Sequence, residues 1–370
     1  MTKTFGVFGL VLGVVACSSG DHDIAQLGED EGELSSKACV GAACPSLLQL
    51  RALLRGGLAT KGDTLYWLAA SGQNDVDGYP IDELQSCQVP ACSTIDKLRL
   101  VLPDGKSIGA SSLVATNGGV FFRGDKHGQA DDSFFLTDGQ TISEIYSSFD
   151  TQHDRYAVDA SGLAILSRDR RTDGWARSNI RHCAFVGVSL ATDCANFAHK
   201  NNNYVLDLAL SPSRLLLTRG TGVVSVERST LAGERREPLQ GDGGISLFTL
   251  GELTLSAQLT VTSSNGKAVH NTTIEHGGTG SFGVVVPGVL RGSTSTATHF
   301  YVATHGEGDV WATQNQGVVA RVSATGAKKT IATQQNAGGV AVAGSKVYWL
   351  DRDVTNTGED WTGLVRYANK

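Results

Sequence analysis

Hydrophobic residues recur along this chain in short runs that come in pairs. Each pair consists of an apolar run, a turn of two or three residues drawn from Gly, Asp, Asn, Ser and Pro, and a second apolar run. The pattern is typical of β-hairpins, because those turn residues tolerate the backbone angles that reverse a strand. Seven such pairs follow one another: 58–68, 113–123, 157–167, 208–218, 247–256, 298–304 and 340–350.

The spacing of these hairpins indicates a repeat. The second strands of successive hairpins lie roughly 38 to 55 residues apart, which fits propeller blades of four strands each. The 45 glycines and the low charged fraction of 18% agree with many short strands joined by tight turns. We therefore predict an all-β chain folded as a β-propeller of seven four-stranded blades. The stretch 244–290 is the least regular, and its strand boundaries stay open.

The last repeat unit, 338–370, contains one strand fewer than the others. Residues 46–54 precede the first hairpin and have no partner of their own. We predict that a strand at about 46–54 completes the last blade and pairs, near Leu50, with the segment near Val365. This pairing would remove the exposed edge that an open sheet would have. The segment 46–54 also has some helical periodicity, so a helix is the alternative.

The N-terminus has the parts of an export signal. Lys3 precedes an apolar run from Phe5 to Ala16, which is shorter than the roughly 20 residues of a membrane-spanning helix. We predict that residues 1–16 form a signal peptide. The sequence Val-Val-Ala-Cys resembles a bacterial lipobox, which implies that Cys17 is acylated and anchors the protein to a membrane. An ordinary signal peptide cleaved nearby is the alternative.

Residues 17–38 are predicted to form a disordered acidic tether, followed by the propeller domain at 39–370. The tether has no apolar period. It carries six acidic residues and one lysine, so most of the net charge of −6 belongs to it. We interpret it as a solvated spacer that holds the domain away from a membrane. An acidic chain also argues against nucleic acid as a partner, because a phosphate backbone requires a basic surface.

Six further cysteines fall into three pairs that are local in sequence: Cys39 and Cys44, Cys87 and Cys92, Cys183 and Cys194. An even number in an exported chain suggests disulfides. Six cysteines permit fifteen connectivities. We predict local pairing, because each pair lies where a turn would join neighbouring strands. With 46–54 as the closing strand, Cys39 and Cys44 would occupy the same place in the last blade as Cys87 and Cys92 do in the first.

Two aromatic segments carry a family resemblance. LYWL at 65–68 and VYWLDRD at 347–353 resemble the YWTD-type repeat of six-bladed propellers. Together with the lipobox and the paired cysteines, residues 39–370 resemble exported β-propeller lipoproteins of myxobacteria and their relatives. The resemblance implies a propeller of six or seven blades and an address in the cell envelope. Ser18 after the cysteine implies sorting to the outer membrane. No acidic Thr-Asp pair follows the aromatics, and the resemblance implies no activity.

The best candidates for a site are the loops that join second and third strands: 71–80, 124–132, 167–175, 304–311 and 351–361. In a propeller they would open on one face, at the mouth of the central channel. Candidate ligand-face residues on them are Asp75, Asp77, Asp125, Trp175, Asp309, Trp311, Asp353 and Trp361. The carboxylates could hold Ca²⁺, although Asp is also an ordinary turn residue. The three tryptophans could form a platform for a carbohydrate or peptide, whereas Trp67 and Trp349 are expected to pack between blades.

No catalytic motif supports a specific reaction. GTGSFG at 278–283 precedes a strand rather than a helix, and we interpret it as a glycine turn. The histidines are scattered along the chain. We therefore predict a monomeric cell-envelope lipoprotein whose propeller binds an envelope protein, peptide or glycan, or acts as a scaffold. The alternative is a metal-dependent propeller hydrolase or lyase with its site at the channel mouth.

Overall fold

The computed structural model describes residues 38–50, 57–126, 132–149, 154–168, 178–199, 205–219, 222–239, 245–264, 267–278, 280–305, 317–352 and 363–370. Their regular structure consists of β-strands and one 3-10 helix, η1 (Gly41–Ala43). The predicted signal peptide and Cys17 lie outside the described residues, as does the predicted tether except for Ala38.

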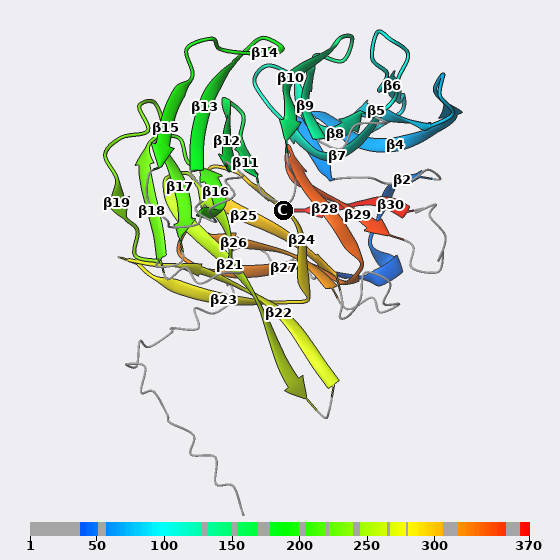
Figure 1. The fold of residues 1–370 in the computed structure, drawn as a ribbon. Coiled ribbons are helices and arrows are strands. Elements are labelled where there is room, and N and C mark those ends of the chain that lie inside the picture. The colour runs from blue at the N-terminus through cyan, green and yellow to red at the C-terminus, as the bar shows by residue number, and fades with distance from the viewer. Residues whose placement is uncertain are drawn as a thin grey trace, which may run out of the picture.

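Seven sheets of four or five strands surround a common centre (Figure 1). Within each sheet the strands are hydrogen-bonded largely in sequence order, and the first strands of neighbouring sheets contact one another. These first strands therefore line the centre, and the later strands lie progressively farther out. The chain is a seven-bladed β-propeller, which confirms the predicted fold and decides between six and seven blades.

Blades 1 to 3 cover the first part of the chain. Blade 1 contains β3 (Leu58–Lys61), β4 (Thr64–Asn74), β5 (Pro80–Gln88) and β6 (Asp96–Arg99). Blade 2 contains β7 (Ile108–Ala115), β8 (Val120–Lys126), β9 (Asp132–Thr137) and β10 (Ile142–Phe149). Blade 3 contains β11 (Arg155–Val158), β12 (Gly162–Arg168), β13 (Ser178–Val186), β14 (Ser189–Leu190) and β15 (Ala195–His199).

Blades 4 to 7 complete the ring. Blade 4 contains β16 (Val205–Leu210), β17 (Arg214–Arg219), β18 (Gly222–Glu227) and β19 (Arg235–Arg236). Blade 5 contains β20 (Ile245–Leu250), β21 (Leu253–Ser264), β22 (Lys267–His276) and β23 (Phe282–Pro287). Blade 6 contains β24 (Val289–Ser295), β25 (His299–His305), β26 (Gly317–Ser323), β27 (Lys328–Gln335) and β1 (Cys39–Val40). Blade 7 contains β28 (Ala337–Ala343), β29 (Lys346–Arg352), β30 (Gly363–Asn369) and β2 (Ser46–Leu50).

Six of the seven predicted hairpins join the first and second strands of a blade, and the remaining segment, 298–304, covers the second strand of blade 6, β25. In the tightest of them, the residues that close the ladder are separated by two turn residues, one of which is glycine. Gly62, Gly251 and Gly344 have φ angles of 60°, 58° and 53°. A side chain would be strained at such angles, so glycine at these positions fixes the turn and the register of both strands.

The core lies between the blades. Trp67 on β4 and Trp349 on β29 are fully buried, and each packs against residues of a neighbouring blade, blade 7 and blade 6 respectively. Their indole Nε1 atoms donate hydrogen bonds of 3.0 Å to the side-chain oxygens of Gln85 and Gln335. The predicted packing role of both tryptophans is confirmed, and the paired amides satisfy the polar end of each ring in the dry interior.

Strand β2 closes the ring. It pairs antiparallel with β30, with Leu48 opposite Val365 and Leu50 opposite Gly363. The predicted pairing of the N-terminal segment with the last blade is confirmed, and the described part of this segment is a strand. Residues 51–54 of the predicted strand lie outside the described residues.

The three local disulfides are formed: Cys39–Cys44, Cys87–Cys92 and Cys183–Cys194. One detail differs from the expectation. Cys39 does not take the place in the last blade that Cys87 takes in blade 1. It lies on β1, which pairs parallel with β27 at the edge of blade 6, with Cys39 opposite Ala332. The closing strand is reached from the neighbouring blade, so the Cys39–Cys44 disulfide ties the edge of blade 6 to the start of β2.

The irregular stretch 244–290 contains a hairpin, β21–β22, that extends beyond the other strands of its blade. Strands β21 and β22 pair out to Ser264 and Lys267, and they project from the body of the propeller (Figure 1). Near the core Ala257 is buried, whereas Leu259 and Val261 farther along β21 are 46% and 58% exposed. The apolar alternation therefore continues beyond the core, which explains why the strand boundaries could not be located here from the pattern of residues.

Candidate functional site

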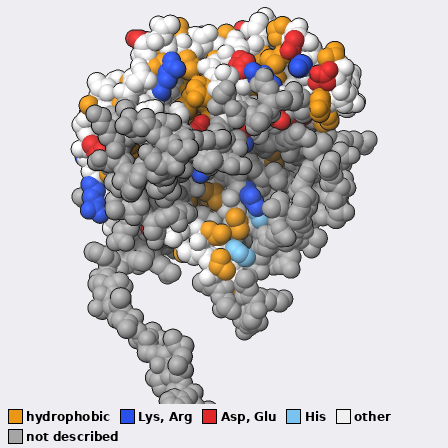
Figure 2. Space-filling view, viewed as in Figure 1, with side chains coloured by type: hydrophobic (Ala, Val, Ile, Leu, Met, Phe, Trp, Pro, Cys, Tyr) orange, Lys and Arg blue, Asp and Glu red, His pale blue; other side chains and the backbone are white. Residues whose placement is uncertain are grey.

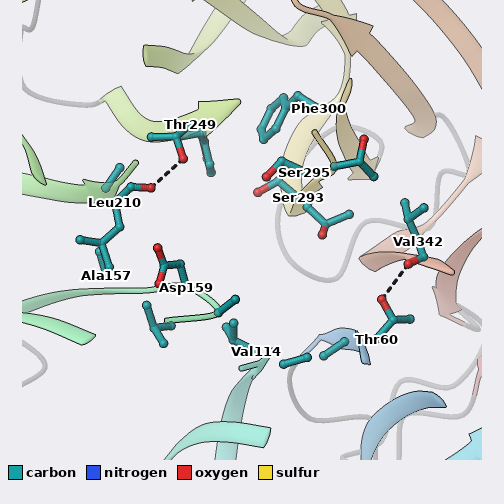
Figure 3. A pocket seen from close by; sticks show the side chains of 18 of the residues that line it. Thr60, Val114, Ala157, Asp159, Leu210, Thr249, Ser293, Ser295, Phe300 and Val342 are labelled. Carbon is teal, nitrogen blue, oxygen red and sulfur yellow. Dashed lines mark hydrogen bonds between the residues drawn. The ribbon is translucent and has the colours of Figure 1, made fainter. Parts of the chain in front are cut away.

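The first strands of the seven blades surround a channel with a cavity of about 690 Å³ at one end (Figure 3). The turns between first and second strands lie at this end, and Gly62, Ala160, Pro212, Gly251 and Thr296 line the cavity. We call this the turn end of the channel. Side chains from all seven blades reach it, so the cavity depends on closure of the ring.

Small, hydroxyl and apolar side chains form most of the lining. Two hydroxyls join neighbouring blades: Thr60 Oγ1 donates to the Val342 carbonyl at 2.8 Å, and Thr249 Oγ1 donates to the Leu210 carbonyl at 2.7 Å. Ser293 lies on the wall formed by β24, together with Ser295 (Figure 3). The first two hydroxyls therefore hold the walls in place, and the two serines present hydroxyls to the cavity.

Asp159 is the carboxylate that lines this cavity, opposite the serines of β24 (Figure 3). Its two oxygens accept hydrogen bonds of 2.5 and 2.9 Å from Nη1 and Nη2 of Arg228, a residue that is 7% exposed. Burial would raise the pKa of Asp159, but the hydrogen bonds and charge of Arg228 outweigh it, and the net pKa is lowered. The bidentate pair fixes an anionic group at the channel mouth.

A buried histidine extends this pair. Arg228 Nε donates a 2.8 Å hydrogen bond to His182 Nε2, and Arg228 Nη1 donates to the Ser211 carbonyl at 3.1 Å. His182 must therefore carry its proton on Nδ1 when it is neutral. Burial and the charge of Arg228 lower the pKa of His182 from 6.5 to about 4. The chain Asp159–Arg228–His182 joins blade 3 to the turn after β18 in blade 4, and Arg228 reaches the turn between β16 and β17 through the Ser211 carbonyl.

The network continues from blade 4 to blade 5. Glu252 Oε2 accepts hydrogen bonds from Ser211 Oγ at 2.9 Å and from Ser213 Oγ at 2.8 Å. Ser211 thus contacts Arg228 through its carbonyl and Glu252 through its hydroxyl. The turn end is held on this side by side-chain bonds across three blades, which makes its geometry rigid before any ligand binds.

Glycines bring the first strands together on the other side. A Cβ atom on Gly292 of β24 would lie 2.7 Å from the Gly339 Cα atom, and one on Gly339 of β28 would lie 3.0 Å from the Gly57 Cα atom. A side chain at either position would collide with backbone. The first strands of blades 6 and 7 and the residue that precedes the first strand of blade 1 therefore approach each other closely.

The loop 71–80 is fully described, and it joins the second and third strands of blade 1, β4 and β5, so it lies at the opposite end of the blade, which we call the loop end. Asp75 and Asp77 lie in the described loop of blade 1. The Asp75 carboxylate accepts hydrogen bonds from the backbone N–H groups of Ser107, Asp77 and Tyr79 and from the Ser107 hydroxyl. Desolvation opposes ionisation, but these bonds lower the pKa of Asp75 to about 2. Asp75 therefore fixes its loop to blade 2, and Asp77 is exposed.

Asp125 lies at the end of β8, beside the first strand of the same blade. A Cβ atom on Gly109 of β7 would lie 2.2 Å from Asp125 Oδ1, so glycine makes room for this carboxylate. The other predicted ligand-face residues lie outside the described residues: Trp175, Asp309, Trp311, Asp353 and Trp361. Their role as ligand residues stays a prediction.

The residues that sequence reasoning missed are Asp159 and Arg228. Asp159 follows a short first strand and reads as an ordinary turn residue. Arg228 lies 69 residues away from Asp159 and 46 from His182, so no local pattern connects them. Among the described residues, no group of three His, Cys, Asp or Glu side chains is arranged to hold a metal ion. In the same part of the chain, no helix has the length and apolar character needed to cross a membrane.

The described surface in Figure 2 mixes Lys and Arg with Asp and Glu, and it does not concentrate one sign of charge.

Comparison with known proteins supports the fold. No protein-family model and no curated protein matches the chain. The β-propeller domain of the Trilobed protease from Pyrococcus furiosus has 11% identity and a TM-score of 0.53, over 86% of this chain and 97% of that chain. That domain is described as having an open velcro topology, whereas β2 closes the last blade here.

Two peptidases also contain similar propellers. An acylaminoacyl peptidase from Pyrococcus horikoshii has 8% identity and a TM-score of 0.53, over 88% of this chain and 54% of that chain. A prolyl endopeptidase has 11% identity and a TM-score of 0.50, over 86% of this chain and 47% of that chain. This chain spans about half the length of these two peptidases. At such identities the likeness shows the β-propeller fold alone.

Proposed function

We propose that the protein is an exported, lipid-anchored binding or scaffold protein of the bacterial cell envelope, which holds its ligand in the propeller channel. The observation that carries this proposal is the turn-end cavity. Its volume of about 690 Å³ lies in the range typical of small-molecule sites. Its rigid lining of hydroxyl, apolar and backbone groups, with the fixed carboxylate of Asp159, suits recognition of a ligand by shape and hydrogen bonds.

Two features support the cellular address. Disulfides persist in oxidising compartments, and the described chain contains three of them. The lipobox-like sequence that ends at Cys17 supplies an anchor, and the acidic segment that follows supplies a spacer. A protein in the cell envelope could meet an envelope protein, a peptide or a glycan as its partner.

Ser295 provides a direct test of binding at the turn end. It is exposed and lines the cavity, so Ser295→Trp should fill the mouth without disturbing the core. We expect immobilised full-length protein to retain a reproducible component of a detergent-solubilised envelope extract. The Ser295→Trp variant should retain at least about tenfold less of it, which corresponds to a loss of roughly 1.4 kcal/mol.

The matched control is Ser189→Trp, which adds the same ring at an exposed position on β14, outside the cavity lining. It should capture the component as well as the unmodified protein does. Capture that is unaffected by Ser295→Trp would contradict binding at the turn end. Metal-dependent hydrolysis of an ester, lactone or glycoside by the purified protein would contradict the non-enzymatic role.

A further inference from the structure

The loop end of the channel contains a second cavity of about 380 Å³ between blades 2, 3 and 4. Arg155 and Tyr156, at the start of β11, line it, as does Asp207 in β16. Both strands run from this cavity toward the turn end, and Val158 of β11 borders both cavities. The two cavities therefore adjoin one another along the same strands, the first toward the turn end and the second toward the loop end, and they offer different chemistry.

Arg123 supplies a positioned cation to this cavity. Its Nε atom lies 3.1 Å from Ser111 Oγ and 3.1 Å from Asp132 Oδ2, which fixes the plane of the guanidinium. Both contacts are made by Nε, so neither of them uses the two terminal nitrogens of Arg123. A guanidinium edge with free N–H groups is the group that binds a carboxylate in two-pronged geometry.

Two carboxylates, those of Asp207 and Asp154, line the same cavity as this cation. Asp207 Oδ2 accepts a 2.8 Å hydrogen bond from the Leu247 backbone N–H, and this bond holds the side chain between blades 4 and 5. Burial raises the pKa of Asp207, although the bonds from Leu247 and Leu208 and the charge of Arg155 oppose the rise. A nearby ligand cation would favour its ionised form. Asp154, which is 6% exposed, also lines the cavity.

We propose that this cavity binds a small zwitterion of the α-amino acid class, with its carboxylate on Arg123 and its ammonium group toward Asp207. The lining holds two arginines and two aspartates, so it presents both signs of charge, and a zwitterion can contact both. Phe149 and Tyr156 give the ligand side chain an apolar wall, and the volume suits one amino acid or a dipeptide.

The inference deepens the proposed function, on which it rests, by naming a ligand class at the other end of the channel. The test is a titration of the full-length protein in detergent with each standard amino acid, followed by calorimetry or ligand-observed NMR. At least one should bind at millimolar concentration or below. For the best one, the N-acetyl derivative and the carboxamide should each bind about tenfold more weakly or worse, because each lacks one of the two charges.

Two variants locate the site. Arg123→Gln and Asp207→Asn should each weaken binding of the best amino acid about tenfold or more. Asp207→Asn keeps an oxygen that can accept from the Leu247 N–H, so it should fold. Arg291→Gln is the matched control, because Arg291 is an exposed residue of β24 outside this cavity, and it should leave the affinity unchanged. An unchanged unfolding midpoint confirms that each variant is folded.

The outcomes separate the two proposals. Failure of every amino acid to bind at millimolar concentration overturns the inference, and so does equal binding of the N-acetyl derivative or of Arg123→Gln. If an envelope component is still captured at the turn end in that case, the proposed function stands without this ligand class. If an amino acid binds as described and no component is captured, the zwitterion site stands and the scaffold role fails.

Discussion

His182 is a buried histidine that remains neutral because its ring nitrogen accepts a hydrogen bond from Arg228. Protonation would remove that acceptor and place two cations side by side. The pKa of His182 is therefore lowered from 6.5 to about 4. Because the folded-state pKa lies below the unfolded value, the unfolded chain takes up a proton first as the pH falls.

His182→Gln tests this account of acid stability. Between pH 6.5 and 4 the unmodified protein should lose on the order of 3 kcal/mol of unfolding free energy through this residue, because one pKa unit corresponds to about 1.4 kcal/mol. Glutamine can accept the Arg228 hydrogen bond and does not titrate, so the variant should show a flatter profile. Urea unfolding of both proteins at several pH values measures the difference.

Asp159 provides the internal reference for this experiment. Its lowered pKa contributes stability that is lost as the pH falls through the folded-state value. That loss should remain in both proteins, because the His182→Gln substitution would leave the Asp159–Arg228 pair intact. Parallel profiles above pH 4 would show that His182 does not titrate as described.

At the level of single strands, we expect the Cys39–Cys44 disulfide to stabilise the fold more than the length of the loop that it closes suggests. Cys39–Cys44 and Cys87–Cys92 have the same sequence separation of 5, so chain entropy gives each a similar contribution of about 2 kcal/mol. Only Cys39–Cys44 joins two blades. The Cys44 carbonyl also accepts a 2.6 Å hydrogen bond from Nη1 of Arg366 in β30.

Replacing each pair by serine should therefore have unequal effects. Cys87→Ser with Cys92→Ser should cost about 2 kcal/mol. Cys39→Ser with Cys44→Ser should cost about 1–2 kcal/mol more, because β1 can leave β27 and the Arg366 bond to the Cys44 carbonyl weakens. Urea unfolding of the full-length variants under oxidising conditions measures both losses. Equal losses, or a larger loss for the second pair, would count against a closing role for the first disulfide.

Turn chemistry explains why the elements were predictable. Gly62, Gly251 and Gly344 each mark a reversal that only a few residue types allow, and the apolar runs on either side are short enough to be strands. Cys39 shows the limit of that reasoning. Its disulfide partner, Cys44, was predicted correctly from the sequence. The sheet that Cys39 joins, however, is set by pairing with Ala332, which lies far along the chain.

At the scale of the whole molecule, the closed ring of blades could be predicted from the sequence, whereas the residues that line its channel could not. The number of blades followed from the spacing of the hairpins. The first strands, however, are covered on both sides by neighbouring blades, and the residues of β11 are all half-buried. They show no alternation of apolar and polar residues that would reveal which side chains face the channel. Arg123 and Arg228 are likewise placed by contacts between strands and between blades, which no local pattern records.

The proposed membrane anchor is the remaining prediction at the scale of the whole molecule, and Cys17 is the residue that tests it. If the lipobox-like sequence is processed, Cys17 carries acyl chains and the propeller follows on its acidic spacer. Cells that express the full chain and are fed an alkyne analogue of palmitate should yield labelled protein in the membrane fraction. Cys17→Ala should abolish the label and release essentially all of the protein from that fraction.

The variant should keep its three disulfides and its unfolding midpoint, because those disulfides join other cysteines, within the described propeller. Loss of label then reports the anchor rather than misfolding. A propeller that remains folded after release would also separate two roles of the N-terminal region, closure of the ring by β2 and the proposed tethering by Cys17. Unlabelled wild-type protein, or equal labelling of Cys17→Ala, would refute the anchor, whereas the proposed binding function of the channel is tested separately by the capture and titration experiments.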